Sequence, residues 1–283
     1  MDRQAVLAFH YPHKTGSMFG YEILKKLSAA TGAPFYSPNN QPANHQKLAE
    51  AVSQYASGLV LRGPVRDFEL TDERSLDTAN LANETPVSLF DSVEYYAVCQ
   101  VRDPLDLVVS QYFSHGWIHA IYPSIDAKIR EDIQAGKISI YDYAVMEFRG
   151  ESGFGEASIL QKYHHLTRLK DLLGGRCLIL RYEDMVLNYP TWSRQMSDFL
   201  RPLAEARALL ASLRPDYGKF RRKEGFWIFG RKQRFWSNPL DYVEQEMRKV
   251  HIRSPLPGDH LNFLTPAEIS SLRSSADQFS GKP

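Results

Sequence analysis

The segment Lys14–Ser17, close to the start of the 283-residue chain, combines residue types that can bind an anion. It follows the apolar run Ala5–Phe9, which predicts a buried strand, and it precedes a stretch with helical spacing. The first N–H groups of a helix have no partner inside the helix, and the helix dipole favours negative charge there. The segment adds a glycine that lets the backbone approach a ligand, two hydroxyls and a full positive charge. It therefore predicts a loop that binds phosphate or sulfate.

The order of residues in this loop differs from that of the common nucleotide-triphosphate loop. That loop needs a glycine, four residues and then Gly-Lys-Ser/Thr. Here Lys14 precedes Gly16, and no glycine lies shortly before the lysine. From these residues alone, the alternative interpretation is a plain strand-to-helix turn with a solvated lysine.

A second set of candidate residues follows the apolar run Tyr95–Val101. Arg102 comes directly after this predicted strand, and Asp103 with Pro104 is typical of a helix start. Ser110 lies about two helical turns further along. A guanidinium and a hydroxyl could hold one phosphate together. The alternative is that Arg102 pairs with Asp103 or Asp106 and that Ser110 is an ordinary residue on the helix surface.

Short apolar runs that alternate with helical patterns predict the scaffold. A parallel sheet with helices on both faces is expected, with ligands at the carboxyl ends of its strands. We expect one α/β domain that covers residues 1–283. The predicted strands are 5–9, 58–62 (ended by Gly63-Pro64), 95–101 and 177–182, and the main predicted helices are 18–31, 104–112, 124–134, 140–148, 155–173, 192–200, 203–213, 243–250 and one from about 266.

The bulk composition narrows the class of protein. A net charge of +1 gives no global attraction to nucleic acid or membrane. The sequence shows no leader pattern and no long apolar span, so a cytoplasmic enzyme is expected. Cys99 and Cys177 lie in apolar runs and are expected to be buried thiols rather than a disulfide or metal pair. No carboxylate or His/Cys cluster suggests a metal site.

Four segments, taken in order, resemble the sulfotransferase family that uses 3′-phosphoadenosine 5′-phosphosulfate (PAPS). They read HKTGSMF, VRDPLDLVVSQYFS, LILRYEDM and IRSPLPGDHLNFLTPAEI, and they run from the first predicted strand to the last helix. The resemblance implies a P-loop-like sulfotransferase fold. It also implies PAPS as co-substrate and no metal.

The resemblance assigns roles to particular residues. The adenine would contact Phe19, which stands where the family usually has a tryptophan, and also Tyr182 and Phe220. Arg253 and Gly258 would belong to a loop that closes on the 3′-phosphate, although the family's lysine, first glycine and tryptophan are missing from it. Arg102 and Ser110 would hold the 3′-phosphate. The loop around the 5′-phosphosulfate would consist of Lys14, Thr15, Gly16, Ser17, Met18 and Phe19.

The general base is not found where the family places it, because neither the expected histidine nor the expected glutamate is present. His115, which follows the helix of Ser110, is the first choice; His45 and His119 are alternatives. His10 and His13 flank the lysine loop and could instead help to hold the donor. Lys14 is expected to neutralise charge on the departing phosphate, which makes it the second catalytic candidate.

The stretch 219–236 mixes seven Lys/Arg with six aromatic residues, which is more aromatic than a solvated basic face. We expect residues 219–240 to form a lid over the active site, with a preference for an acidic acceptor such as a polysaccharide or an anionic lipid. A peripheral membrane contact is an alternative interpretation of this composition. Binding of single-stranded nucleic acid ranks last, because there is no second basic region.

The predicted function is transfer of a sulfuryl group from PAPS to a hydroxyl of a carbohydrate, lipid or small molecule by in-line displacement. The alternatives are a Mg-dependent nucleotide or small-molecule kinase on a related fold and a non-catalytic nucleotide-binding module. The order of lysine before glycine argues against the kinase. The sequence does not identify the acceptor or the oligomeric state.

Overall fold

The computed structural model describes residues 5–36, 58–65, 93–118, 127–152, 158–201, 226–228, 231–233 and 256–279. The chain divides into two compact units. We call Met1–Val101 with Lys162–Pro215 the sheet unit, and Arg102–Gln161 with Asp216–Pro283 the helical unit.

The sheet unit contains a parallel five-stranded sheet. In β1, all six side chains are buried, as expected for a central strand covered on both faces. The pairing of Ala5 with Leu59 and with Glu94 aligns β1 with both of its neighbours, so their carboxyl ends lie along one edge. The strands, in spatial order, are β2 (Phe35–Tyr36), β3 (Leu59–Val65), β1 (Ala5–His10), β4 (Glu94–Val101) and β5 (Cys177–Arg181).

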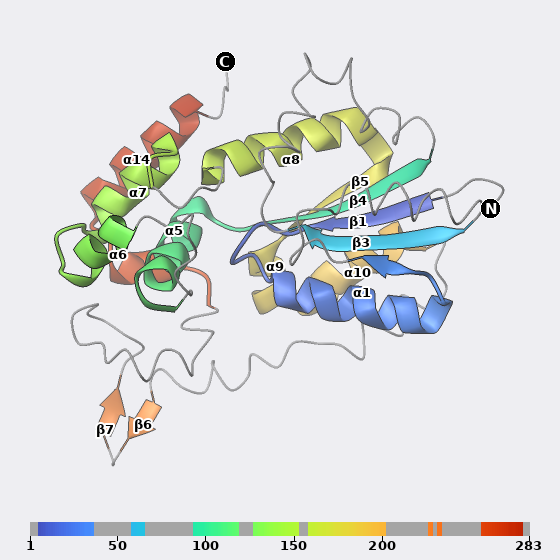
Figure 1. The fold of residues 1–283 in the computed structure, drawn as a ribbon, viewed down its shortest axis with the longest axis horizontal. Coiled ribbons are helices and arrows are strands. Elements are labelled where there is room, and N and C mark those ends of the chain that lie inside the picture. Colours follow the sequence, from blue (N-terminus) through green and yellow to red (C-terminus); the bar gives the residue numbers. More distant parts are fainter. Residues whose placement is uncertain are drawn as a thin grey trace. The chain divides into compact units, whose positions relative to one another are not determined.

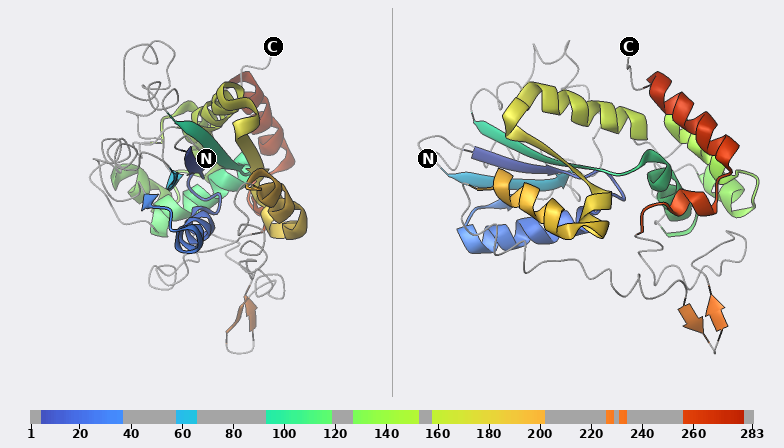
Figure 2. Two further views of the ribbon diagram at one scale, coloured as in Figure 1. Left: turned by 90° about the vertical axis from the view of Figure 1, so that its right-hand side faces the viewer. Right: turned by 180° about the vertical axis from the view of Figure 1, so that it is seen from behind.

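Helices cover both faces of this sheet, which confirms the predicted α/β class (Figure 1). On one face, Val6 and Ala8 of β1 pack with Leu166 and Leu169 of α8. On the other face, Gly20 of α1 lies against the side chains of Phe9 and Tyr11. Figure 2 shows the same layers from behind. The helices of this unit are α1 (Ser17–Thr31), α8 (Ile159–Leu173), η3 (Gly174–Arg176), α9 (Tyr182–Leu187) and α10 (Tyr189–Phe199).

The predicted end of β3 is wrong. β3 does not stop at Gly63-Pro64 but continues to Val65. The register of β1 against β3 shifts between Ala8 and His10, where the chain bulges. Gly63 permits this because its φ is +124°, and a Cβ there would lie 2.7 Å from the carbonyl oxygen of Phe9. A proline is tolerated in a strand at such a bulge.

The two cysteines are free and buried, as predicted. They lie on the neighbouring strands β4 and β5, with 3.7 Å between their Sγ atoms. The hydrogen bond with Cys177 and, to a smaller extent, burial raise the pKa of the Cys99 thiol. These thiols therefore belong to the core of the sheet unit.

The helical unit packs around aromatic side chains. Tyr112 contacts Tyr143 edge-on at a ring distance of 5.6 Å, and Phe113 contacts Phe263 at 5.2 Å. In Figure 1, α7 and α14 lie side by side, joined by a 3.1 Å hydrogen bond between the Tyr141 and Ser271 hydroxyls. Its elements are α5 (Pro104–Phe113), the π-helix η2 (Ser114–Ile118), α6 (Ala127–Gln134), α7 (Ile140–Arg149), the antiparallel strands β6 (Phe226–Ile228) and β7 (Arg231–Gln233), η5 (Asp259–Asn262) and α14 (Pro266–Phe279).

Several predictions fall outside the described residues. These are the helices expected at 203–213 and 243–250 and, apart from β6 and β7, the proposed lid at 219–240. The edge strand β2 was not predicted, because the segment from Pro34 reads as a loop rich in proline and asparagine. Among the described residues, none of the helices has both the length and the apolar character that crossing a membrane requires.

Candidate functional site

The segment after β1 forms a tight loop with an unusual backbone. Lys14 has a φ of 66° and Gly16 a φ of 92°, so both lie in the left-handed region. This region is uncommon for a lysine and readily adopted by a glycine. A Cβ at Gly16 would also lie 2.9 Å from Cε of Met185 and 3.0 Å from Nε2 of Gln100. The sequence pattern therefore marks a position that both conformation and packing reserve for glycine.

Hydrogen bonds inside the loop fix its shape. The backbone N–H of Thr15 donates to the carbonyl of Pro12 at 3.1 Å, and the Thr15 hydroxyl donates to the same carbonyl at 2.6 Å. The proton of the Thr15 hydroxyl is therefore used in a hydrogen bond within the loop. The first hydrogen bond of α1 runs from Phe19 N–H to the Gly16 carbonyl at 2.9 Å. The amides of Gly16 and Ser17 precede it, at the positive end of the helix dipole.

Gln100 of β4 anchors this loop, and sequence reasoning missed it. Its side-chain Nε2 donates to the carbonyl of Thr15, and its Oε1 accepts a 3.1 Å hydrogen bond from the indole N–H of Trp192. Gln100 and Trp192 are both fully buried. The only signal for this role was a polar side chain inside the otherwise apolar run Tyr95–Val101.

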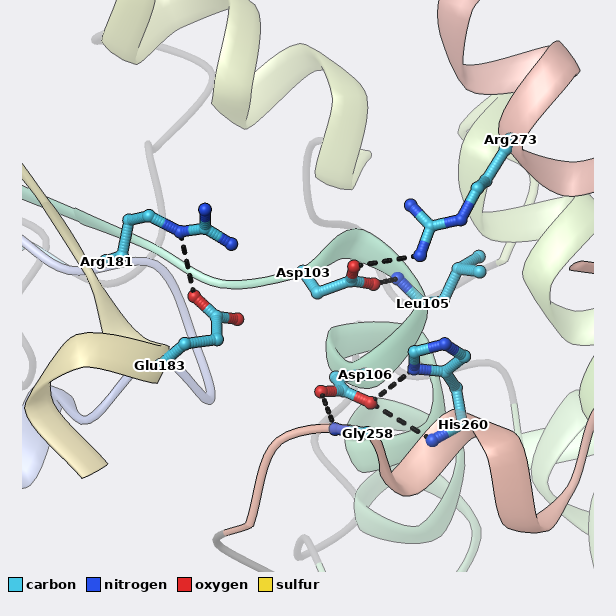
Figure 3. Close-up of polar contacts among 8 residues, drawn as sticks. All are labelled: Asp103, Leu105, Asp106, Arg181, Glu183, Gly258, His260 and Arg273. Atoms are coloured by element: carbon cyan, nitrogen blue, oxygen red, sulfur yellow. Dashed lines mark hydrogen bonds and ion pairs between the residues drawn. The ribbon is translucent and has the colours of Figure 1, made fainter. Parts of the chain in front are cut away.

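The other residues of the sheet unit that are predicted to bind the sulfuryl donor lie near the carboxyl ends of its strands. Phe19 packs with Trp192 at a ring distance of 5.9 Å and with Tyr189 at 6.3 Å. Tyr182 is buried and begins α9 directly after β5, between the exposed Arg181 and its ion-pair partner Glu183 (Figure 3). Met18 is exposed.

His10, at the end of β1, is a buried histidine of the sheet unit. Its Nε2 lies 3.1 Å from the hydroxyl of Tyr95. Burial, with smaller effects of Arg62 and His165, lowers the pKa of His10 well below its ordinary value. The ring is therefore neutral at physiological pH.

In the helical unit, Arg102 lies two residues before the start of α5 and is buried. Asp103 caps the helix by accepting the N–H of Leu105 at 2.9 Å, and it pairs with Arg273 at 3.1 Å (Figure 3). Pro104 is the first helical residue, so the predicted helix start is confirmed. Ser110 is partly buried on the same helix.

Asp106 lies one turn before Ser110, and sequence reasoning considered it only as a possible partner of Arg102. Its carboxylate accepts hydrogen bonds from Gly258 N–H at 2.7 Å and from His260 N–H at 3.0 Å, and its Oδ1 lies 2.6 Å from His260 Nδ1 (Figure 3). The structure thus brings Gly258 to the helix that carries Ser110. Burial alone would raise the pKa of Asp106, but the bonds from His260 and Gly258 and the charge of Arg102 together lower it.

His115, the predicted base, lies in the π-helix η2 that continues α5. It is buried, and its Nδ1 lies 2.7 Å from the hydroxyl of Tyr143 on α7. A histidine held at one nitrogen by a third group is the arrangement expected of an oriented base. Phe220, Arg253, His45 and His119 lie outside the described residues.

The described residues supply groups for anions and none for a metal. No group of three His, Cys, Asp or Glu residues in this part of the chain could hold a metal ion. The loop at Lys14 offers an ammonium group, and the start of α1 offers amides for a phosphate or sulfate.

Comparison of the sequence with protein-family models and with curated proteins finds no match. Comparison with solved structures does. The structure of mouse sulfotransferase SULT7A1 complexed with PAP has a TM-score of 0.57 at 13% identity, over 100% of this chain and 86% of that chain. The structure of retinol dehydratase in a complex with retinol and PAP has a TM-score of 0.50 at 12% identity, over 99% of this chain and 82% of that chain. The chain therefore has the fold of the sulfotransferases, as the sequence motifs predict.

Proposed function

We propose that this protein is a sulfotransferase that uses PAPS and transfers its sulfuryl group to a hydroxyl. The observation that carries the proposal is the loop at Lys14–Phe19, which Gln100 holds at the carboxyl ends of a parallel sheet of the sulfotransferase fold. In open α/β sheets this edge is where ligands bind. The four sequence motifs and a fold shared with a PAP complex support the same conclusion.

The roles of the residues follow from their chemistry. When bound, PAPS supplies the sulfuryl group, which passes to the acceptor oxygen by in-line displacement. The Lys14 ammonium and the amides at the start of α1 would hold the 5′ end and neutralise charge on the departing phosphate. Arg102 and Ser110 would hold the 3′-phosphate, together with the segment around Gly258. Lys14 and Arg102 would supply the positive charge that the departing group needs.

The acceptor is proposed to be a hydroxyl compound, either a small molecule, a lipid or a carbohydrate. The complex of retinol dehydratase with retinol supports the first two classes. His115 is proposed as the general base, with its ring oriented by the contact between Nδ1 and the Tyr143 hydroxyl. Residues 219–240 are proposed as an acceptor lid that could also touch a membrane surface.

A thermal-shift screen with PAP, ATP plus magnesium, and NAD tests the donor class. A ligand at a hundred times its dissociation constant adds about 2.7 kcal/mol of stability. We expect PAP alone to shift the melting temperature. A shift by ATP with magnesium and not by PAP would replace this proposal with a kinase.

Turnover of labelled PAPS with a panel of hydroxyl acceptors tests catalysis. Binding of PAP without transfer to any acceptor would instead indicate a non-catalytic nucleotide-binding module. The triple variant R221A/R222A/K223A tests the lid, because it should raise the acceptor KM while the Kd for PAP stays unchanged. An equal loss for donor and acceptor would contradict that role.

A further inference from the structure

We propose that Asp106 is a positioning residue that fixes the segment Leu256–His260 against α5 and so makes the protein prefer a donor with a 3′-phosphate. The inference builds on the proposed function, because it concerns how the same donor is held. Its basis is the set of three contacts that this one carboxylate makes with Gly258 and His260.

These contacts use both carboxylate oxygens. Oδ2 accepts the N–H of Gly258, while Oδ1 accepts the N–H of His260 and contacts its Nδ1. The side chain of Asp106 is only 1% exposed, so little water competes for these bonds. Gly258 and His260 lie 152 and 154 residues further along the chain. The carboxylate is therefore a long-range tie rather than a local cap.

A neutral side chain of the same shape could not make this tie. A buried carboxylate is tolerated only when donors surround it, and here two backbone amides, the His260 ring and the nearby charge of Arg102 do so. An asparagine has one oxygen, and its NH₂ group would face a donor. Asp106→Asn should therefore keep the volume and lose the anchor.

The position of Asp106 links the tie to the proposed 3′-phosphate residues. Asp106 and Ser110 are four residues apart on α5, so they share one face of the helix. Gly258 has a φ of 88° and is the N-cap residue before η5, so contacts of the neighbouring residues are needed to fix the direction of the chain there. His260 stands where the resembled family has a tryptophan, and its ring supplies the third contact.

The experiment compares Asp106→Asn with Asp103→Asn, which removes the same charge from the same helix start but keeps a capping side chain. Calorimetry measures the Kd of each protein for PAP and for adenosine 5′-phosphate, which lacks the 3′-phosphate. We expect Asp106→Asn to raise the Kd for PAP about tenfold or more, since hydrogen bonds to a charged group are strong. The Kd for adenosine 5′-phosphate should change little. Asp103→Asn should leave the ratio of the two Kd values unchanged.

A second readout needs no ligand. Amide hydrogen exchange at Gly258 and His260 should be faster in Asp106→Asn than in wild type or Asp103→Asn, because their acceptor is lost. His260→Ala keeps both backbone bonds and should show a smaller loss of PAP preference, which covers the case in which Asp106→Asn does not fold.

The outcomes separate the two proposals. A wild-type protein that does not bind PAP overturns the proposed function, and the positioning role with it. A wild-type protein that prefers PAP, with that preference unchanged in Asp106→Asn, or in His260→Ala where Asp106→Asn does not fold, overturns the positioning role alone.

Discussion

Two loops in this protein are held by a single buried side chain each, and the two anchors differ in kind. In the sheet unit, the neutral amide of Gln100 holds the Lys14 loop through the carbonyl of Thr15 and is itself held by Trp192. In the helical unit, the charged carboxylate of Asp106 holds Gly258 and His260.

Because the two anchors differ in charge, the two loops should respond differently to pH. An amide both donates and accepts and carries no charge, so its bonds do not depend on pH. A carboxylate accepts only, and its bonds weaken once it is protonated. The first anchor should fail only when residues are removed, and the second should also fail in acid.

The largest expected effect comes from neither anchor but from His115, which lies in the helical unit. His115→Ala should lower turnover by roughly two to four powers of ten, because a positioned base contributes that much. The Kd for PAP should stay unchanged, in contrast to Asp106→Asn. Single-turnover kinetics with labelled PAPS measures the step, and His119→Ala is the matched control. A full loss in His119→Ala and none in His115→Ala would move the base to the other histidine.

Lys14→Ala probes what the Gln100 anchor holds in place. Turnover should fall about a hundredfold or more, because a preorganised charge at a leaving group is worth about 3–4 kcal/mol of barrier. Lys25→Ala, on the exposed side of the same α1, serves as the control. Steady-state rates at saturating PAPS give the comparison, and a Lys14→Ala rate within a fewfold of wild type would rule out the catalytic role.

Gln100→Leu breaks the neutral anchor. It would leave the Thr15 carbonyl and the Trp192 indole N–H buried without a partner, so the free energy of unfolding should drop by about 2–4 kcal/mol. Gln134→Leu is the control, because Gln134 makes one partly buried bond, to the Gly116 carbonyl at 2.6 Å. Urea unfolding measures both, and equal losses in the two variants would argue against a special role for Gln100.

Acid should distinguish the two anchors, with little effect near neutrality. The lowered pKa of Asp106 means that its contribution is complete above the ordinary aspartate range and is lost as pH falls through the lowered value. Between pH 5 and 8, the Kd ratio of PAP to adenosine 5′-phosphate should not change through Asp106.

In acid, below about pH 4, exchange at Gly258 and His260 should rise while the amide of Thr15 stays protected. Among the described residues, the Arg102 guanidinium and the titratable ring of His260 face Asp106. Asp106→Asn should abolish the difference. Loss of protection at both loops at the same pH would mean global unfolding and would remove the contrast.

Much of the fold could be predicted from the sequence, because the signals are local. The apolar run of β1, the helix start at Asp103-Pro104 and the stop at Gly32 each depend on residues a few positions apart. Gly32 has a φ of 71° and donates to the Ser28 carbonyl, as a helix-ending glycine does. The predicted end of β3 was wrong because the bulge at Gly63 depends on pairing with the neighbouring strand.

The candidate site could be predicted from the sequence only in part. Lys14 and Ser110 could be singled out by type and spacing, and their roles stay predictions. Gln100 and Asp106 could not be singled out, because nothing near them in sequence tells which group each contacts.

The strands, the helices and the loop that can attract an anion could therefore be predicted from local sequence, since dihedral preferences and helix ends are set within a few residues. The contacts of Gln100 with Thr15 and of Asp106 with Gly258, at separations of 85 and 152 residues, arise only from tertiary packing. Such pairs form because burial leaves a polar group no partner except the one that packing brings to it.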